Sequence, residues 1–191
     1  MTSAKNTMSR LRHSAIDARR SMSDEARANA SSIICHKVIH SHEFMSCETI
    51  ACYLPLADEV DPIDVIDRAW CAKKRIFSPV IDMRGNMIFR QLTPNTDLRR
   101  NNFGLLEPVS GTVVTAKSID LVITPVVAFD NEHHRIGMGG GYFDRSFYFL
   151  KHRKKWLRPK LLGVAFDCQE VEKFAPNPWD IPLYQVITER S

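Results

Sequence analysis

The feature that most constrains the fold is the stretch of residues 135–145, which reads Arg-Ile-Gly-Met-Gly-Gly-Gly-Tyr-Phe-Asp-Arg and holds four of the chain's eight glycines. Glycine has no side chain and accepts a positive φ, so such a run lets the backbone curl and approach a ligand closely. Residues 120–129 before it are apolar and β-rich, and Phe143, Phe147 and Leu150 recur after it at helical spacing. The order strand, glycine loop, helix points backbone N–H groups at one spot, which suits an anion such as a phosphate.

Charged side chains bracket this loop. Arg135 and Arg145 place permanent positive charge at its two ends, and Asp144 falls in the first turn of the expected helix. There Asp144 can cap the helix or hold a hard metal ion through its oxygens. The loop is not a Walker A motif, because no Gly-Lys-Ser/Thr follows, and it lacks the final spaced glycine of a dinucleotide fingerprint. From the residues alone, a phosphate-binding loop and a plain tight turn both stay open.

The complete string resembles the signature Arg-Leu-Gly-x-Gly-x-Gly-Tyr-Tyr-Asp-Arg of the 5-formyltetrahydrofolate cyclo-ligases, also called methenyltetrahydrofolate synthetases. The chain departs from it at Ile136 and at Phe143, where one hydroxyl is lost, and keeps its glycines and charges. The resemblance covers the chain from Arg12 to Asp180. It implies an ATP- and Mg²⁺-dependent ligase that converts 5-formyltetrahydrofolate into 5,10-methenyltetrahydrofolate, with release of ADP and phosphate.

The resemblance also implies a set of site residues. Arg145 is the expected catalytic residue. The residues expected to bind ATP, the co-substrate, are Arg12, Arg135, Ile136, Gly137, Met138, Gly139, Gly140, Gly141, Tyr142 and Phe143. The residues expected to bind the folate are Leu54, Glu59, Met138, Gly139, Gly140, Gly141 and Tyr142. The expected ligands of Mg²⁺ are Asp144 and Asp180.

Residues 9–22 read as a basic amphipathic helix. Its apolar stripe consists of Leu11, Ala15, Ala18 and Met22, and the arginines at positions 10, 12, 19 and 20 lie off that stripe. By itself this pattern favours a solvated helix face. The resemblance adds another interpretation, in which Arg12 belongs to a Lys-x-x-x-Arg pair that contacts nucleotide phosphate. Met8 stands where the lysine is expected, and Arg10 is the alternative source of that charge.

A second helix and a strand–helix–strand unit follow. Ser23 is a typical N-cap, and the buried face of its helix is expected to be Ala26, Ala30, Ile33, Ile34 and Val38. Residues 49–56 and 75–81 read as strands, which predicts a parallel pair. Asp61 and Pro62 start the helix between them. The apolar face of that helix is expected to be Ile63, Ile66 and Trp70.

Two of the residues assigned to the folate lie just after the first of these strands. In the family, a leucine at the strand end and the glutamate of an Asp-Glu-Val segment line the folate pocket, and Leu54 and Glu59 match them. From the residues alone, Glu59 is an ordinary loop carboxylate.

The remaining segments complete an alternating pattern. Residues 82–86 read as a turn, 87–92 as a strand, 97–102 as a short helical turn, 103–108 as a loop near the pocket and 109–117 as a linker. An apolar strand is expected within residues 160–167, and the proline-rich tail, 174–188, ends in a β-like run. Strands and helices alternate along most of the chain, which predicts an α/β fold. We expect a single domain over residues 1–191, with a mostly parallel central sheet and helices on both faces.

Further positions bear on metal binding. Asp180 matches a carboxylate near the family's C-terminus. The family often has a second aspartate four residues later, where this chain has Tyr184, so we expect no metal ligand at position 184. His36 and His40 are one turn apart, with His42 nearby. No clear further ligands follow, so surface histidines are expected rather than a zinc site.

The composition limits the partners. Hydrophobic residues make up 44% and charged residues 25% of the chain, as in an ordinary soluble globular protein, and the net charge is +4. Residues 151–160 hold six Lys or Arg and one Trp, which leaves a rival function open: a non-catalytic nucleotide- or RNA-binding module. Such a run is more often a solvated helix end, so nucleic acid is not an expected partner.

The location follows from what the chain lacks. The five cysteines are irregularly spaced and include no Cys-x-x-Cys, which indicates reduced thiols. No secretory signal and no apolar run of membrane-spanning length is evident. We therefore expect a cytoplasmic enzyme that acts away from membranes on ATP and 5-formyltetrahydrofolate, with or without a polyglutamate tail.

Overall fold

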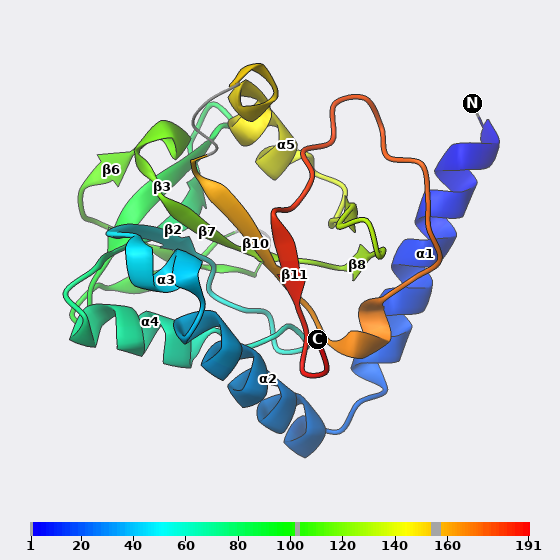
Figure 1. Ribbon diagram of the computed structural model, residues 1–191. Coiled ribbons are helices and arrows are strands. Elements are labelled where there is room, and N and C mark those ends of the chain that lie inside the picture. The colour runs from blue at the N-terminus through cyan, green and yellow to red at the C-terminus, as the bar shows by residue number, and fades with distance from the viewer. Residues whose placement is uncertain (1, 102–103, 154–157) are drawn as a thin grey trace.

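A seven-stranded sheet in the order β11-β10-β7-β1-β2-β3-β6 runs through the middle of the computed structural model, which describes residues 2–101, 104–153 and 158–191 (Figure 1). Its strands are β1 (Thr49–Cys52), β2 (Arg75–Ile81), β3 (Met87–Leu92), β6 (Val113–Val114), β7 (Leu121–Pro125), β10 (Lys160–Val164) and β11 (Gln185–Ile187). Neighbours from β11 to β2 pair in parallel, while β3 is antiparallel to both β2 and β6. The mostly parallel sheet is confirmed.

The α-helices are α1 (Thr2–Arg20), α2 (Asp24–Ile39), α3 (His42–Ser46), α4 (Ile63–Cys71) and α5 (Tyr142–Phe147). Single 3₁₀ turns are η1 (Ala116–Ser118), η2 (Tyr148–His152) and η3 (Asp167–Gln169). Two small hairpins stand outside the main sheet, β4 (Leu98–Arg100) with β5 (Leu106–Pro108) and β8 (Ala128–Phe129) with β9 (Arg135–Ile136).

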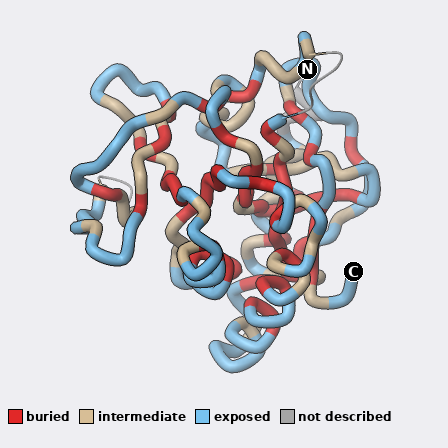
Figure 2. The backbone as a smooth tube through the Cα atoms, turned by 60° about the vertical axis from the view of Figure 1, so that its left-hand side comes forward, coloured by how far each residue is buried: buried red, intermediate tan, exposed pale blue. Residues whose placement is uncertain are grey.

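Helices cover both faces of the sheet, as the sequence predicts. Successive residues of a strand point to opposite faces, so Ile50 of β1 joins the core beneath α2, α3 and α4, and Ala51 joins the core beneath α5. The first core includes Ile34 and Ile66, and the second includes Phe147. Figure 2 shows the buried residues in the interior and the exposed ones on the outer helical turns and loops.

The predicted N-cap Ser23 is confirmed, whereas α4 begins one residue later than predicted, at Ile63, with Pro62 as its N-cap. The backbone N–H of Ala26 donates to Oγ of Ser23 at 3.1 Å, which caps α2. The backbone N–H of Ile63 donates to Oδ1 of Asp61 at 3.0 Å at the start of α4. Each of these bonds satisfies an N–H that has no partner within its helix.

The buried faces of these two helices differ in part from the expected ones. Ala26 and Ile33 of α2 are exposed, and Ser31 and Cys35 are buried instead, beside Ala30, Ile34 and Val38. Ile63 of α4 is exposed, and Val65 and Ala69 are buried with Ile66. Each helix is rotated slightly about its axis because the sheet and the neighbouring helix, rather than the densest apolar stripe, set the buried direction.

One segment was assigned the wrong structure. Residues 98–100 of the expected helical turn form the strand β4, and residues 106–108 of the expected loop form its partner β5. Gly104, with φ of 78°, donates its N–H to the carbonyl oxygen of Asn101 at 3.0 Å, next to the ends of both strands. Residues 102–103, which belong to the predicted loop, lie outside the described residues. The expected linker, 109–117, contributes β6 and most of η1.

The N-terminal helix forms a third, smaller core. Leu11 and Ala15 of α1 pack with Ala128 of β8, Ile136 of β9 and Phe174 of the tail. Figure 1 shows α1 on the side of the molecule away from β6. The stripe predicted from Leu11 and Ala15 is confirmed, and it fixes α1 beside the hairpin that leads into the glycine loop.

Candidate functional site

The two predicted site segments start from adjacent strands of the sheet. The order of the strands reverses between β1 and β7. From β1 the chain continues through α4 to β2 on one side, and from β7 it continues to β10 on the other side. In open α/β sheets, ligands bind outside the carboxyl ends of the strands at such a reversal of strand order. The carboxyl end of β1 leads to Leu54 and Glu59, and that of β7 leads through β8 and β9 to the glycine loop.

The glycine loop has the open backbone that its composition predicts. Gly139 and Gly141 have φ of 99° and 63°, a left-handed region that side chains rarely adopt. A Cβ atom added at Gly139 would meet only the guanidinium of Arg12, at 3.9 Å, and one added at Gly137 would meet nothing within 4 Å. The loop therefore leaves room beside its backbone for a ligand.

Two arginines hold the loop by its carbonyl groups. Arg12 of α1 donates from Nε to the carbonyl oxygen of Gly137 at 2.8 Å. Arg145 of α5 donates from Nη1 to the carbonyl oxygen of Gly140 at 2.8 Å, and its guanidinium lies 4.9 Å from the centre of the Tyr142 ring. The structure thus brings Arg12 to the loop from the other end of the chain.

Two neighbours of Arg12 point elsewhere. Arg10 pairs with Glu172 at 3.6 Å on the surface, with both side chains more than 70% exposed. Met8, which stands at the position of the expected lysine, packs against the α1 core. Among the α1 side chains that the structure describes, from residue 6 onward, Arg12 is therefore the cation that contacts the loop.

Arg135 clamps the loop to the C-terminal tail. Its side chain is 6% exposed, and Nη2 lies 2.6 Å from Oδ1 of Asp144. Nη1 donates to the carbonyl oxygen of Ile181, whose own N–H donates to Asp144 Oδ1 at 3.0 Å. Burial lowers the pKa of the Arg135 guanidinium, and the charges of Asp144 and Asp180 act in the opposite direction. Both expected metal ligands therefore lie near one buried cation.

In the described part of the chain, Asp144 and Asp180 each have one carboxylate oxygen that accepts no hydrogen bond. Asp144 uses Oδ1 for Arg135 and Ile181. Asp180 uses Oδ2, which accepts from the backbone N–H of Asn177 at 2.8 Å and from its side-chain Nδ2 at 3.1 Å. Asp144 does not cap α5 through these bonds, because its two partners, Arg135 and Ile181, lie outside that helix.

The donor set fits Mg²⁺ better than a metal held in a protein cage. No group of three or more His, Cys, Asp or Glu in the described part of the chain could hold an ion. Mg²⁺ is usually bound through one or two carboxylates, substrate phosphates and water, which matches two carboxylates with one available oxygen each. The rings of His36 and His40 are tilted toward each other with their centroids 4.2 Å apart, and both residues are exposed.

Glu59 is not the ordinary loop carboxylate that its sequence context suggests. Its Oε2 accepts from the backbone N–H of Leu56 at 3.1 Å, and its Oε1 lies 3.8 Å from Nη1 of Arg19. Burial raises the pKa of this carboxyl, and the N–H of Leu56 and the charge of Arg19 oppose that rise. Leu54, nearby, packs against the core beneath α2 and α4.

Arg19 is a residue that the sequence interpretation placed on the solvated face. Only 2% of its side chain is exposed, and Nη2 also lies 3.1 Å from Oδ2 of Asp58. Its Nε atom is buried without a hydrogen-bond partner in the described structure. A signal for its burial is present in the sequence, because position 19 follows Ala15 by four residues and so continues the buried stripe.

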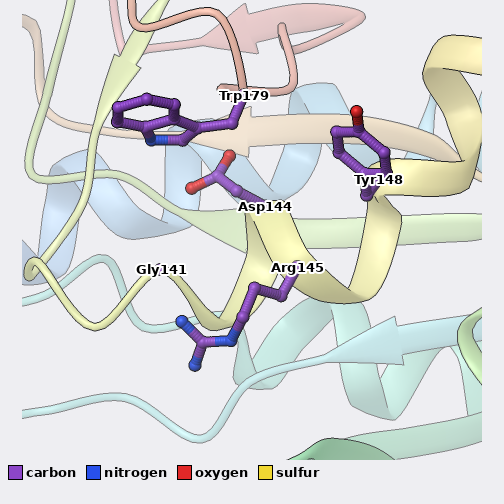
Figure 3. A pocket seen from close by; sticks show the side chains of 5 residues that line it. All are labelled: Gly141, Asp144, Arg145, Tyr148 and Trp179. Atoms are coloured by element: carbon purple, nitrogen blue, oxygen red, sulfur yellow. The ribbon is translucent and has the colours of Figure 1, made fainter.

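A cleft of about 370 Å³ lies beside the loop and is lined by Gly141, Asp144, Arg145, Tyr148 and Trp179 (Figure 3). The sequence interpretation missed Tyr148 and Trp179.

A second cavity, of about 650 Å³, lies between β2, β3 and the β4–β5 hairpin. Its arginines are Arg90, Arg99 and Arg100. Leu54 and Glu59 line neither of these two cavities.

Comparison with known proteins decides the family. Residues 4–189 match the 5-formyltetrahydrofolate cyclo-ligase family. The chain belongs to this family. It is 38% identical over 144 residues to the 5-formyltetrahydrofolate cyclo-ligase of Escherichia coli K12, covering 73% of this chain and 77% of that one. The cyclo-ligase of Haemophilus influenzae is 30% identical over 151 residues, which cover 76% of this chain and 78% of that one.

Solved structures agree with the family assignment. The 5,10-methenyltetrahydrofolate synthetase of Aquifex aeolicus matches with a TM-score of 0.81 and 29% identity, over 96% of this chain and 90% of that one. The synthetase of Mycoplasma pneumoniae, at 22% identity, shares the fold with a TM-score of 0.75 over 95% of this chain and 98% of that one.

Membership of the cyclo-ligase family confirms the resemblance drawn from the glycine string. It supports an enzyme over the rival nucleotide- or RNA-binding module. The basic run proposed for that module includes residues 154–157, which lie outside the described residues.

No helix in the described ranges is long and apolar enough to cross a membrane. All five cysteines are free, with Cys71 and Cys168 exposed and the other three buried.

Proposed function

We propose that this protein is an ATP- and Mg²⁺-dependent cyclo-ligase that converts 5-formyltetrahydrofolate into 5,10-methenyltetrahydrofolate, ADP and phosphate. The observation that carries the proposal is the open backbone at Gly139, with the Arg12 guanidinium 3.9 Å from the position of the missing Cβ. Backbone N–H groups and a fixed cation at such a loop suit a phosphate chain. Family membership supplies the reaction for which the phosphate would be used.

The chemistry explains why the site needs charge rather than a nucleophile. The formyl oxygen of an amide is a poor leaving group, and transfer of the γ-phosphoryl group to this oxygen makes it a good one. The neighbouring folate nitrogen then attacks the formyl carbon and loses its proton, and phosphate leaves with the former formyl oxygen. Phosphoryl transfer depends mainly on positioning and on neutralising charge, so no covalent intermediate with the protein is required.

Each charged residue has a role in this proposal. The loop N–H groups and the guanidinium groups of Arg12 and Arg145 hold the phosphates, and Arg145 stabilises the charge on the transferred group. Arg135, buried against Asp144, fixes the loop and the tail in register. Asp144 and Asp180 would hold Mg²⁺ through their available oxygens, and the bound ion would supply positive charge beside the phosphates.

The folate would bind toward the end of β1. Glu59 accepts hydrogen bonds from the polar edge of the pterin, Leu54 contacts the folate, and residues 138–142 bind it from the glycine loop. Arg19 orients Glu59, and its positive charge opposes the rise in the pKa of Glu59 that burial causes. The substrate carries one or more glutamates, and the cytoplasm is the proposed location.

A chromophore assay tests the proposal. Purified protein is mixed with 5-formyltetrahydrofolate, ATP and Mg²⁺, and the absorbance of the methenyl product is followed over time. We expect product only when all three are present, and none after the metal is chelated. Folded protein that binds ATP and forms no methenyl product would instead support the binding-module alternative.

A further inference from the structure

We infer that Asp130 and His134 are positioning residues of the nucleotide site, because together they lock the turn between β8 and β9 that leads into the glycine loop. The inference rests on the proposed ATP-dependent function. It extends the site to a turn, residues 130–134, that holds none of the residues assigned to ATP, folate or Mg²⁺.

The first observation is the way in which the Asp130 carboxylate is bonded. The side chain is fully buried, and its Oδ1 accepts from the backbone N–H groups of Glu132 and His134, each at 3.0 Å. Its Oδ2 accepts from the backbone N–H of Phe174 at 3.3 Å and lies 3.0 Å from the ring Nδ1 of His134, which donates because a carboxylate only accepts. Burial acts against the charge on Asp130, yet the bonds from His134 and the backbone lower its pKa below the ordinary value. The carboxylate therefore satisfies four donors that would otherwise lose this partner.

The second observation comes from another turn of the chain with the same bonds. In the turn between β2 and β3, Oδ1 of Asp82 accepts from the backbone N–H groups of Arg84 and Asn86, and the Asn86 side chain lies 3.4 Å from Oδ2. Residues 83–86 of that turn are exposed, and in the described structure no residue outside the turn bonds to the Asp82 carboxylate. Asp130 differs in being buried and in its bond to Phe174 of the tail. Closing the turn does not require this extra bond, so we assign it to the attachment of the tail.

The turn also contains a strained residue. His133 has φ of 63°, at the position where the turn of Asp82 has Gly85 with φ of 78°. A residue with a side chain adopts this conformation at a cost, and the conformation persists where the surrounding structure determines it. The tail contributes to this, since the N–H of Leu183 donates to the carbonyl oxygen of His133 at 3.2 Å.

The turn is connected to two of the cations at the loop. The residue that follows it, Arg135, is the buried cation of the clamp on the tail. Phe174, which bonds to Asp130, packs in the small core with Leu11 of α1, the helix that lies beside β8 (Figure 1). Arg12 of that helix donates to the glycine loop. A shift of the turn would therefore displace both cations relative to the loop, and phosphoryl transfer depends mainly on positioning.

Calorimetry with ATP, together with thermal unfolding, tests the inference on the full chain. The Kd is measured well below the Tm of each variant, so that it reports the geometry of the site in folded protein. His134→Ala removes one of the four bonds and should raise the Kd of ATP roughly 10-fold, near the lower end of what the loss of a hydrogen bond to a charged group causes. Asp130→Ala removes all four and should lower kcat/KM for ATP by up to roughly 100-fold, as a displacement of about 1 Å can.

Matched variants separate positioning from general damage. His134→Asn places an amide N–H near the position of the ring Nδ1 and should restore the native Kd. Asp82→Ala removes the same bonds from the other turn, so it should lower the Tm and leave the Kd of ATP unchanged. If Asp130→Ala does not fold, the two His134 variants decide the question, since they keep the three backbone bonds of Asp130.

Three results would overturn the inference. Native ATP affinity in folded His134→Ala would make the bond a purely structural one. An equal loss of affinity in Asp82→Ala would assign the effect to lower stability. A loss in His134→Asn as large as in His134→Ala would assign it to the missing ring and not to the bond. The proposed function fails separately: a protein that binds ATP with the expected pattern of variants and forms no methenyl product would overturn the enzyme and support the positioning of its nucleotide site.

Discussion

Arg12 donates a hydrogen bond of 2.8 Å from its Nε atom to the carbonyl oxygen of Gly137, although the two residues are 125 positions apart. Seven positions further along α1, which is about two helical turns and 10.5 Å, Arg19 contacts the loop of Asp58 and Glu59. One face of a single helix therefore braces both segments assigned to ligands. The relative position of these two segments depends on how α1 is seated on its small core.

Replacement of Arg12 should weaken nucleotide binding. Arg12→Ala removes a charged side chain at the edge of the loop and a bond to its backbone, so ATP affinity should fall by about 1.5–3 kcal/mol, as for a lost charge-assisted hydrogen bond. Calorimetry with ATP measures the change. Arg10→Ala is the matched control on the same helix, because Arg10 pairs with Glu172 at the surface, and it should leave the affinity unaltered. Equal effects from both variants would mean that α1 acts only through its overall charge.

Replacement of Gly139 should abolish ATP binding in a protein that still folds. Valine at a φ of 99° is strained by about 1–3 kcal/mol, and its branched side chain would fill the space open to the ligand. Gly85→Val is the control, because Gly85 has φ of 78° and nothing within 4 Å of its Cβ position, in the turn between β2 and β3 that holds none of the predicted site residues. Both variants should lose thermal stability, and only Gly139→Val should lose ATP binding. Normal ATP affinity in folded Gly139→Val would remove the loop from the phosphate site.

Neutralising Asp144 should expose the metal requirement. Asn at position 144 can still accept from Arg135 and Ile181 through its amide oxygen, so Asp144→Asn removes charge while retaining the clamp. We expect turnover to fall at least roughly 10- to 100-fold, which is the loss that usually follows mutation of a residue that only orients a metal ligand. The Mg²⁺ concentration that gives the half-maximal rate should rise. Asp180→Asn should have the same effect more mildly, because its segment belongs to a proline-rich tail. Turnover with normal Mg²⁺ dependence in Asp144→Asn would place the ion elsewhere.

The pair of Arg19 and Glu59 should control the acid side of the pH profile. Burial already raises the pKa of Glu59, and Arg19 opposes that rise, with Asp58 acting in the same direction as burial. Arg19→Met should therefore raise the pKa further. Glu59 then takes up its proton at a higher pH, and the acid limb of kcat/KM for 5-formyltetrahydrofolate moves upward.

Two variants check the cause of this shift. Arg19→Lys keeps the positive charge and should keep the limb near its native pH. Glu59→Gln should remove the limb whichever residue stands at position 19. A lower kcat in Arg19→Met with an unmoved limb would assign Arg19 a purely structural role.

Much of the fold could be predicted because it depends on neighbours in the sequence. The bounds of β2 and β3 were predicted to the residue, and the cap of Ser23 was recognised. Strand propensity, turn chemistry and capping act over a few residues, so they can be read from a short window. The glycine string likewise determined an open loop and, through its resemblance, the family.

Only the tertiary structure decided which side chains serve the site. Arg10, Arg12 and Arg19 are the same residue type on one helix, yet one lies on the surface, one at the loop and one in the interior. The clamp joins Ile181 to Asp144 and Arg135, which lie 37 and 46 positions earlier in the chain. The cleft likewise joins Trp179 of the tail to residues of the glycine loop and α5. Such contacts are set by the direction in which each helix packs, and the spacing of residues along the chain does not contain that direction.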